Sequence, residues 1–447
     1  MASPGSDLTS EPLILHSHDV ATRVRYRVVV MLCLLTFILY LDRICISQAA
    51  SSIEHDLNMS HTAMGFVLAA FTVAYAAFEV PVGRWGDRHG SRGVLTRIVI
   101  WWSLFTLLTG AATGLVMLIV VRFLFGAGEA GALPNAARVV SRWFPADARG
   151  PAQGLVVTAA LVGGTLAPVV TESLLGTVGW RWSFVLLGVP GLVWAAFFFW
   201  WFRDNPADHA QTNELERAYI RAGTEASEPA HLHPPVPWRL VFASANIWLL
   251  GSVISCCCFT TYLFFSWYPT YLKEGRGVTP SESGWLAGMV LAGGAVGSTA
   301  GGYLSDWLVR FTGNRRGSRR AIGCCALTSS ALAMAASIHC DSPWLGAACC
   351  SWACLGVHLQ LASWWSAVME ISGKHLGALF GLMNAMGMPG AVGSQLFLGP
   401  FVQWLGDRGH VGRAQWDSAF YVYGFVLLIG AVCWLFVDTT RAIEEPA

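Results

Sequence analysis

Residues 98–121 read IVIWWSLFTLLTGAATGLVMLIVV and contain no charged side chain. A helix needs about 20 mainly apolar residues to cross the hydrocarbon core of a bilayer. Inside that core, backbone N–H and C=O groups must find partners within the protein, which only helices and closed barrels achieve. Because barrel strands are shorter and alternate apolar with polar residues, this stretch predicts a membrane-spanning helix.

The rest of the chain repeats this pattern. Of its 447 residues, 54% are hydrophobic and only 12% are charged, whereas a soluble protein carries about 25% charged residues. Residues 184–202 and 421–437 are further runs without charge. We therefore predict an all-α membrane protein with twelve transmembrane helices. Their expected positions are residues 28–50, 62–83, 94–115, 117–139, 152–175, 183–202, 247–272, 283–307, 321–338, 343–371, 376–405 and 418–438.

One long polar stretch, residues 203–246, divides the chain near its middle. It predicts a linker between two six-helix halves, residues 1–202 and 247–447. A repeated motif supports duplication, because residues 83–92 after the second helix read GRWGDRHGSR and residues 302–307 after the eighth read GYLSDW. Two halves related by pseudo-symmetry are one of the main transporter architectures.

Arginine and lysine residues set the expected orientation. Most of them fall on one side of the predicted helices, including the segment before the first helix, the linker and the basic run at residues 315–320. Loops rich in these residues stay in the cytoplasm. We therefore expect both termini and the linker to be cytoplasmic.

Several classes of function are disfavoured by composition. A net charge of +1 gives no reason to expect nucleic-acid binding. The 12 cysteines mostly lie inside apolar runs, where cysteine acts as a small hydrophobic residue. The predicted helices hold neither a metal-binding cluster nor a nucleophile–base set. We therefore predict that the protein is not an enzyme and has no metal or cofactor.

The motif at residues 83–92 resembles the loop motif between helices two and three of the major facilitator superfamily. Three further segments resemble the anion:cation symporter family within it. These are YLDRICIS at residues 40–47, RFLFGAGEAGALP at residues 122–134 and SWYPTYL at residues 266–272. The resemblance implies proton-coupled import of sugar acids such as hexuronates, aldonates and aldarates. It also implies the bacterial inner membrane, since the external loops are short. The chain departs from the family pattern at Cys45 and at Ala160, where the family has a helix-five glutamine.

Four ionisable residues stand out inside predicted helices: Asp42, Arg43, Arg122 and Glu129. A charge near the bilayer centre costs at least about 2.5–3.5 kcal/mol, so it is usually paired and functional. These four charges cancel, and a bound carboxylate would leave one excess negative charge that protonation removes. We assign Asp42 and Glu129 to proton coupling. Arg43 is assigned to the substrate, because its fork can hold two carboxylate oxygens.

We assign Arg122 to a charge pair. Because it lies two helical turns before Glu129 on the same face, a purely structural Arg122–Glu129 pair within this helix is the alternative to a functional role. Polar and aromatic groups complete the expected site. Tyr40 shares a face with Arg43, Tyr75 lies in the middle of the second helix, and the resemblance implies contacts at Trp364 and Asn384. His358 and Gln360 remain outside candidates, since a hydrogen bond to a neighbouring helix would also explain them.

A cytoplasmic gate is the expected role of the loop motif and the helix ends near it. A loop acid can pair with arginines across helices and close that face, with an acid from the other half joining. A solvated loop that only fixes topology is the alternative. The candidate gate residues are Gly83, Asp87, Arg88, Arg92, Arg142 and Glu370.

The leading hypothesis is symport of an organic anion, most directly a sugar acid, by alternating access. Exchange or efflux of another organic anion, such as an aromatic carboxylate, is the alternative, because residues 163–170 partly resemble an antiporter motif. A receptor that binds without transport fits less well, since sensing needs no buried protonatable groups. The expected partners are the anion, protons and the lipid bilayer, with the protein as a monomer.

Overall fold

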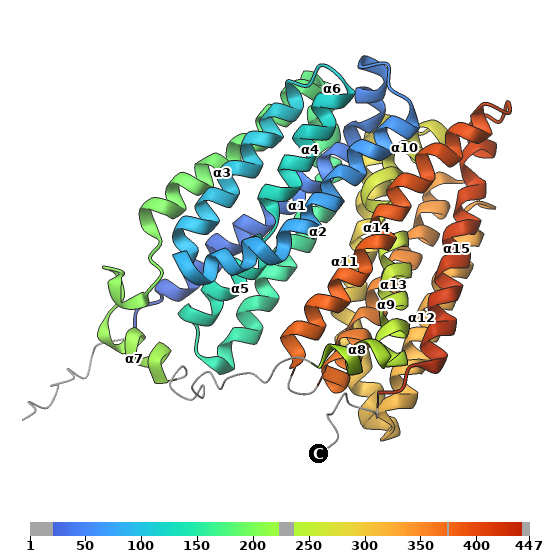
Figure 1. Cartoon of the computed structure of the whole chain (residues 1–447). Helices are drawn as coiled ribbons and strands as arrows, with labels where there is room; N and C mark the ends of the chain where they lie inside the picture. The colour runs from blue at the N-terminus through green and yellow to red at the C-terminus, as the bar shows by residue number, and fades with distance from the viewer. Residues whose placement is uncertain (1–20, 223–236, 373–374, 440–447) are drawn as a thin grey trace, which may run out of the picture.

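The computed structural model describes residues 21–222, 237–372 and 375–439, and the regular elements in these ranges are helices. Two groups of long helices lie side by side, one from each half of the chain (Figure 1). We call the end at which α7 and α8 lie the linker end, and the opposite end, at which α10 lies, the far end (Figure 1).

The N-terminal half is formed by six helices. A break at Gly131, whose φ of +84° favours glycine, splits the predicted fourth span just after Glu129. The fifth and sixth spans form one continuous element with a kink at Gly179. The helices are α1 (Val24–Asp56), α2 (His61–His89), α3 (Ser91–Gly110), α4 (Leu115–Glu129), α5 (Ala132–Trp143) and α6 (Ala146–Trp201).

In the C-terminal half, the seventh span differs from a regular α-helix. It consists of α9 (Ala245–Tyr262) and α10 (Tyr268–Thr270), separated and followed by π-helical turns at Leu263–Trp267 and Tyr271–Gly275. Such turns are rare and are often found at functional sites. The remaining helices are α11 (Pro280–Thr312), α12 (Arg315–Ser337), α13 (Pro343–Ser372), α14 (Leu376–Gly406) and α15 (Arg413–Phe436).

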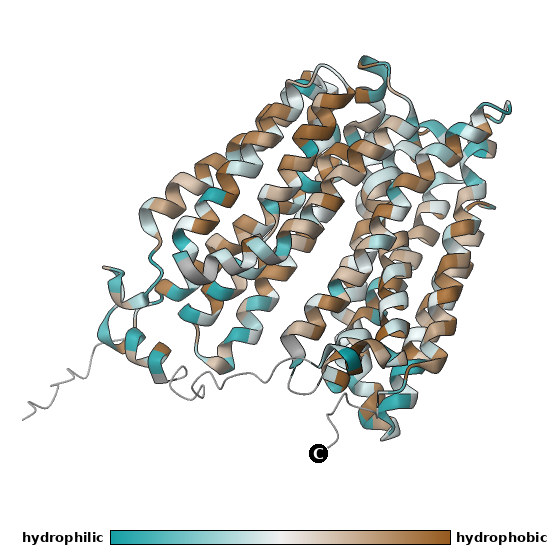
Figure 2. Ribbon diagram, viewed as in Figure 1, coloured by the Kyte–Doolittle hydropathy of each residue, from teal (hydrophilic) through white to brown (hydrophobic). Residues whose placement is uncertain are grey.

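The twelve predicted spans are confirmed. In the described ranges, nine helical segments are long and apolar enough to cross a membrane. One of them, α6, contains two spans, and α11 and α14 pack among the others with lengths of 33 and 31 residues. Apolar residues follow the helices, and hydrophilic residues collect at both ends and on α7 (Figure 2). The architecture is that of a helical membrane protein.

The two halves touch most closely through α2 with α14 and α6 with α11. At Gly399, a Cβ atom would lie 2.3 Å from the carbonyl oxygen of His61, so only glycine permits this approach. Hydrogen bonds also join the halves toward the far end: Thr72 Oγ1 donates to Gln395 Oε1 at 2.8 Å, and Thr62 pairs with Gln403. The described contacts therefore close the molecule at its far end.

Two ion pairs reinforce the closure at the far end. Lys273 Nζ lies 2.8 Å from Glu172 Oε2 of the other half. The next residue, Glu274, accepts from His61 Nε2 at 3.3 Å, while Glu54 lies 3.0 Å from His61 Nδ1. Consecutive residues of one π-helical turn thus hold two different helices of the N-terminal half.

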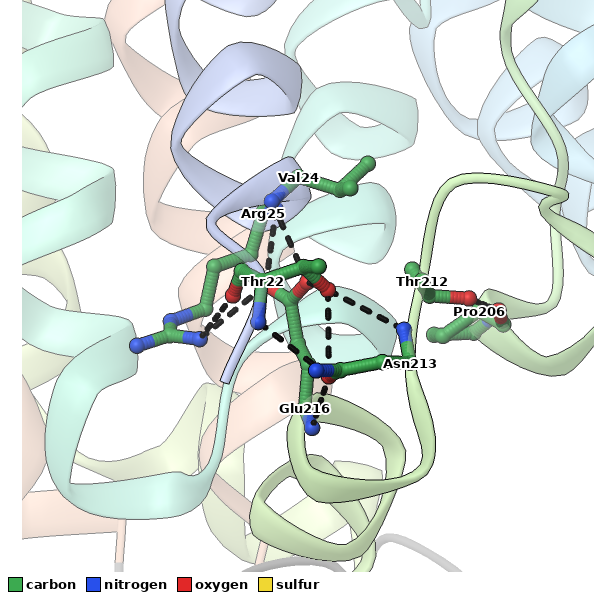
Figure 3. Close-up of polar contacts among 7 residues, drawn as sticks. All are labelled: Thr22, Val24, Arg25, Pro206, Thr212, Asn213 and Glu216. Carbon is green, nitrogen blue, oxygen red and sulfur yellow. Dashed lines mark hydrogen bonds and ion pairs between the residues drawn. The ribbon is translucent and has the colours of Figure 1, made fainter. Parts of the chain in front are cut away.

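The predicted linker contains a short 3₁₀ turn (Pro206–Asp208), α7 (Glu214–Ala222) and α8 (Trp238–Ala243). Its first part, with α7, folds against the N-terminal half, whereas α8 packs against α9 of the C-terminal half. The buried Glu216 of α7 accepts hydrogen bonds from Val24 N and Arg25 N at 3.1 Å each and from Thr22 Oγ1 at 2.6 Å (Figure 3). A carboxylate is stabilising at a helix N-terminus. Because Glu216 satisfies these N–H groups, α1 begins four residues before its predicted start at residue 28.

Candidate functional site

The central feature of the site is an ion pair between α1 and α4. Arg43 lies in the middle of α1, and Glu129 is the last residue of α4. Arg43 Nε donates to Glu129 Oε1 at 2.7 Å, and its Nη2 donates to the same oxygen. The side chain of Glu129 is fully buried and that of Arg43 is 11% exposed. The pair belongs entirely to the N-terminal half.

Aromatic rings surround the guanidinium of Arg43. Its Cζ lies 5.1 Å from the ring centre of Tyr40, 5.3 Å from that of Phe71 and 4.7 Å from that of Tyr75. A cation over an aromatic face is attracted by the ring quadrupole. The rings therefore hold the guanidinium in place, and the structure brings the predicted residues Tyr40 and Tyr75 beside Arg43.

Arg122 and Glu129 are not hydrogen-bonded to each other in this conformation. Glu129 is paired with Arg43, which reaches it from α1. The guanidinium of Arg122 instead lies over the rings of Phe71, at 5.1 Å, and Phe125, at 4.5 Å. Its Nε has no hydrogen-bond partner among the described residues.

Asp42 is almost fully enclosed, with 1% of its surface exposed. Neither carboxyl oxygen has a hydrogen-bond partner in the described part of the chain. The buried indole Nε1 of Trp102 in α3 also lacks a partner within the described ranges. A buried, ionised carboxyl without hydrogen bonds is costly.

Two small cavities lie next to each other near these residues, and Ile44 and Phe265 line both of them. The first is lined by the two arginines and has a volume of about 20 Å³, which is room for little more than one water molecule. The second also has a volume of about 20 Å³ and lies between α1, α6, α11 and α13. Polar and charged side chains line the first cavity at Arg43, Arg122, Tyr262, Ser266 and Gln395 and the second at Tyr40, Thr165, Cys354 and His358.

The other predicted contacts have different surroundings. Asn384 Nδ2 donates to Glu79 Oε2 at 3.1 Å and so joins the halves on the linker side of the cavities. Trp364, a predicted substrate contact, is buried and lines neither cavity. Its Nε1 donates to the carbonyl of Leu250 at 2.9 Å. Trp364 therefore packs α13 against α9. Gln360 also links helices, since its amide bonds Cys257 and Trp434.

Sequence reasoning missed three polar residues of the C-terminal half. Gln395 Nε2 donates to Ser266 Oγ at 3.0 Å, and both residues line the first cavity with Tyr262. Ser266 is the first residue of the SWYPTYL segment, and the resemblance of this segment to the family did not identify Ser266 as a cavity residue. Glutamine and tyrosine within long apolar helices carry no charge that would mark them in a single sequence.

Two of the candidate gate residues, Arg92 and Glu370, are held within their own halves in this conformation. Arg92 Nε donates to the carbonyl of Phe199 at 2.8 Å, and Glu370 forms an ion pair with Arg319 at 2.8 Å. Gly83 packs near Pro134, and Arg142 is exposed. The side chains of Asp87 and Arg88 lie outside the described residues. The gate therefore stays a prediction.

Comparisons with known proteins agree with this arrangement. The family model described as the Major Facilitator Superfamily matches residues 32–395. The chain is 32% identical to a probable sulfoacetate transporter of Cupriavidus necator, over 95% of this chain and 96% of that protein. It is 31% identical to a probable galactarate/D-glucarate transporter of Bacillus subtilis, over 92% and 93%. A bacterial homologue of the human lysosomal transporter Spinster, solved in an inward-facing and occupied conformation, shares the fold with a TM-score of 0.78 at 19% identity, over 96% of this chain and 100% of that one.

Proposed function

The chain belongs to the major facilitator superfamily and is a membrane transporter, and we propose that it imports a sugar acid together with protons. The observation that carries this proposal is the Arg43–Glu129 pair beside the enclosed Asp42. These groups combine a carboxylate-binding cation with two acids that can change charge, at a depth where net charge is costly.

The pair suggests how an anion and a proton are coupled. A substrate carboxylate that takes the place of Glu129 on Arg43 would leave Glu129 without its cation. Burial disfavours the charged form of such a group, so Glu129 then takes up a proton. Release of the substrate restores the Arg43–Glu129 pair and returns the proton. Each transported anion is thus matched by a change in the charge of Glu129, with Asp42 as a second proton carrier.

Alternating access follows from the contacts between the halves. The far end is closed by cross-half ion pairs and hydrogen bonds. We assign the far end to the outside of a bacterial inner membrane and the linker end to the cytoplasm, since the arginine-rich loops lie at the linker end. In this conformation the site is sealed from outside, and import requires the Lys273–Glu172 and His61–Glu274 pairs to open and reform.

The substrate is proposed to be a compact polyhydroxylated anion. Its carboxylate would bind Arg43, with hydroxyl groups near Tyr40 and Tyr75 and, after release from Glu79, the amide of Asn384. A neutral sugar lacks the charge that draws proton uptake, so it should bind weakly and should not couple.

A short anion such as a sulfonate is the second candidate. The relative from Cupriavidus necator is a probable sulfoacetate transporter. Ala160, which stands where related transporters would have a glutamine, is buried and offers no hydrogen bond to a hydroxyl. These two observations favour a substrate with fewer hydroxyl groups.

Uptake into proteoliposomes with an imposed pH gradient tests the proposal. A panel of D-gluconate, D-glucuronate, D-glucarate, sulfoacetate and D-glucose should show concentrative, gradient-dependent uptake of a sugar acid and none of glucose. Uptake of sulfoacetate alone would establish the second candidate. Uptake that does not respond to the pH gradient would contradict proton coupling.

A further inference from the structure

One ring nitrogen of His358 in α13 is hydrogen-bonded, and the other has no hydrogen-bond partner among the described residues. Its Nδ1 lies 2.9 Å from the carbonyl oxygen of Cys354, one helical turn earlier. A carbonyl oxygen only accepts, so Nδ1 must carry the hydrogen. No described residue is bonded to Nε2, and no charged side chain among the described residues interacts with the ring. With the hydrogen on Nδ1, the neutral tautomer of His358 offers Nε2 as a hydrogen-bond acceptor.

The ring faces a space that the fold keeps open for it. His358 lines the second cavity with Tyr40 and Thr165. A Cβ atom at Gly294 of α11 would lie 3.1 Å from the imidazole, closer than most such contacts. Glycine at this position leaves room for the ring between α11 and α13.

Among the side chains that line the second cavity, His358 supplies the strongest hydrogen-bond acceptor, its Nε2. Thr165 Oγ1 donates to the carbonyl of Leu161 at 2.8 Å, so its hydrogen is used within α6. Leu161, Leu291 and Ala295 make the remaining wall apolar. The second cavity shares the wall residues Ile44 and Phe265 with the first, and the ring of Tyr40, which lines the second, lies 5.1 Å from Arg43 Cζ. An anion held by Arg43 is therefore placed to direct its far end past Tyr40 toward His358.

We propose that His358 and the second cavity form a subsite that accepts a hydrogen bond from the terminal hydroxyl of the substrate and selects a monoanion over a dianion. This inference rests on the proposed sugar-acid function and specifies its substrate class. A hydroxyl can donate to Nε2, whereas a terminal carboxylate would place its lone pairs against that of the neutral imidazole. A terminal methyl group would leave Nε2 without a partner.

Equilibrium binding to the purified full-length protein, with three six-carbon probes, tests this subsite. D-gluconate ends in a hydroxyl, 6-deoxy-D-gluconate in a methyl group and D-glucarate in a second carboxylate. The wild type should bind D-gluconate about fivefold more tightly than either analogue, the size of one neutral hydrogen bond. His358→Leu should remove this preference by weakening D-gluconate alone, and its unchanged affinity for 6-deoxy-D-gluconate would show that it folds. His358→Gln, which retains an acceptor, should keep part of the preference.

His410→Leu is the matched control, because His410 is exposed near the far end, and this variant should behave as the wild type. A preference that survives in His358→Leu, or that is absent from the wild type while all three probes bind, overturns the subsite and leaves the sugar-acid function standing. Failure of the wild type to bind any of the three probes overturns the sugar-acid function and the subsite with it.

Discussion

The two halves contribute different chemistry to the central cavities. From the N-terminal half come both guanidinium groups, with two carboxyl groups directly behind them. The residues that the C-terminal half contributes to the cavity walls carry neither a guanidinium nor a carboxyl group, and its polar members are Tyr262, Ser266, Cys354, His358 and Gln395. One half thus supplies charge and the other supplies neutral hydrogen-bonding groups.

This division has a physical reason in a transporter whose halves move against each other. Movement of the halves against each other does not by itself break an ion pair that lies within one half, so the Arg43–Glu129 pair changes only when substrate or a proton binds. A pair that joined the halves at the same depth would be broken in every cycle, at a cost of several kcal/mol for each charge left alone. The cross-half pairs Lys273–Glu172 and His61–Glu274 lie at the far end, where water can take over from the lost partner.

The largest effect should come from Arg43→Lys in the charged half. A lysine ammonium cannot reproduce the planar fork that holds Glu129 and, as proposed, the substrate carboxylate. We expect affinity for D-gluconate to fall by about 100-fold, measured by binding to purified protein with thermal unfolding as the check on folding. Arg408→Lys, at an exposed position, is the control. Wild-type affinity in Arg43→Lys would show that Arg43 does not bind the anion.

Glu129→Gln should separate binding from coupling. Glutamine mimics the protonated acid, so substrate exchange across the membrane should continue while accumulation driven by a pH gradient is lost. Counterflow and gradient-driven uptake in proteoliposomes measure the two activities. Glu214→Gln, in the exposed part of α7, should keep both. Concentrative, pH-driven uptake by Glu129→Gln would remove Glu129 from the coupling mechanism.

Lys273→Met tests the contact between the halves and should have an intermediate effect. It removes the cation that faces the largely buried Glu172, so far-end closure should weaken. Hydrogen exchange at residues 279–290 should rise, and the transport rate should fall several-fold. Arg181→Met breaks the Arg181–Asp56 pair, which lies within one half and is about half exposed. Because such surface pairs contribute about 0–1 kcal/mol, it should change neither quantity, and equal effects of both variants would contradict a role of the Lys273–Glu172 pair in far-end closure.

Trp364→Phe in the neutral half should have the smallest effect on transport. Loss of the hydrogen bond to the Leu250 carbonyl should lower the free energy of unfolding by about 1 kcal/mol. The KM for uptake should stay within about twofold of wild type, because the side chain lines neither cavity. A KM that rises tenfold without a change in unfolding temperature would restore Trp364 as a substrate contact.

Prediction from the sequence succeeded for features that depend on local composition. Uncharged runs located the twelve spans. The scarcity of charge inside them singled out Asp42, Arg43, Arg122 and Glu129, whose proposed roles stay predictions. Partners could not be predicted in the same way. Spacing along one helix suggested Arg122 as the partner of Glu129. In the folded protein, Arg43 of α1 forms the ion pair with Glu129.

The same limit applies to Trp364 and His358. Both lie on one helix, six residues apart, and nothing in their local sequence shows which of them faces a cavity. Packing against α9 buries the first, and the space left by Gly294 of α11 opens the second to the cavity. The helices that pack against α13 therefore decide their roles.

A bundle of membrane-spanning helices with a small set of ionisable residues inside them follows from the amino-acid sequence alone, because each polar residue placed in hydrocarbon adds its own free-energy cost. Which charges meet, where the two cavities lie and which end is closed depend on how the helices pack. Those outcomes depend on contacts between helices far apart in the chain. The start of α1 shows the same dependence, since Glu216, nearly 200 residues away in sequence, caps its first N–H groups.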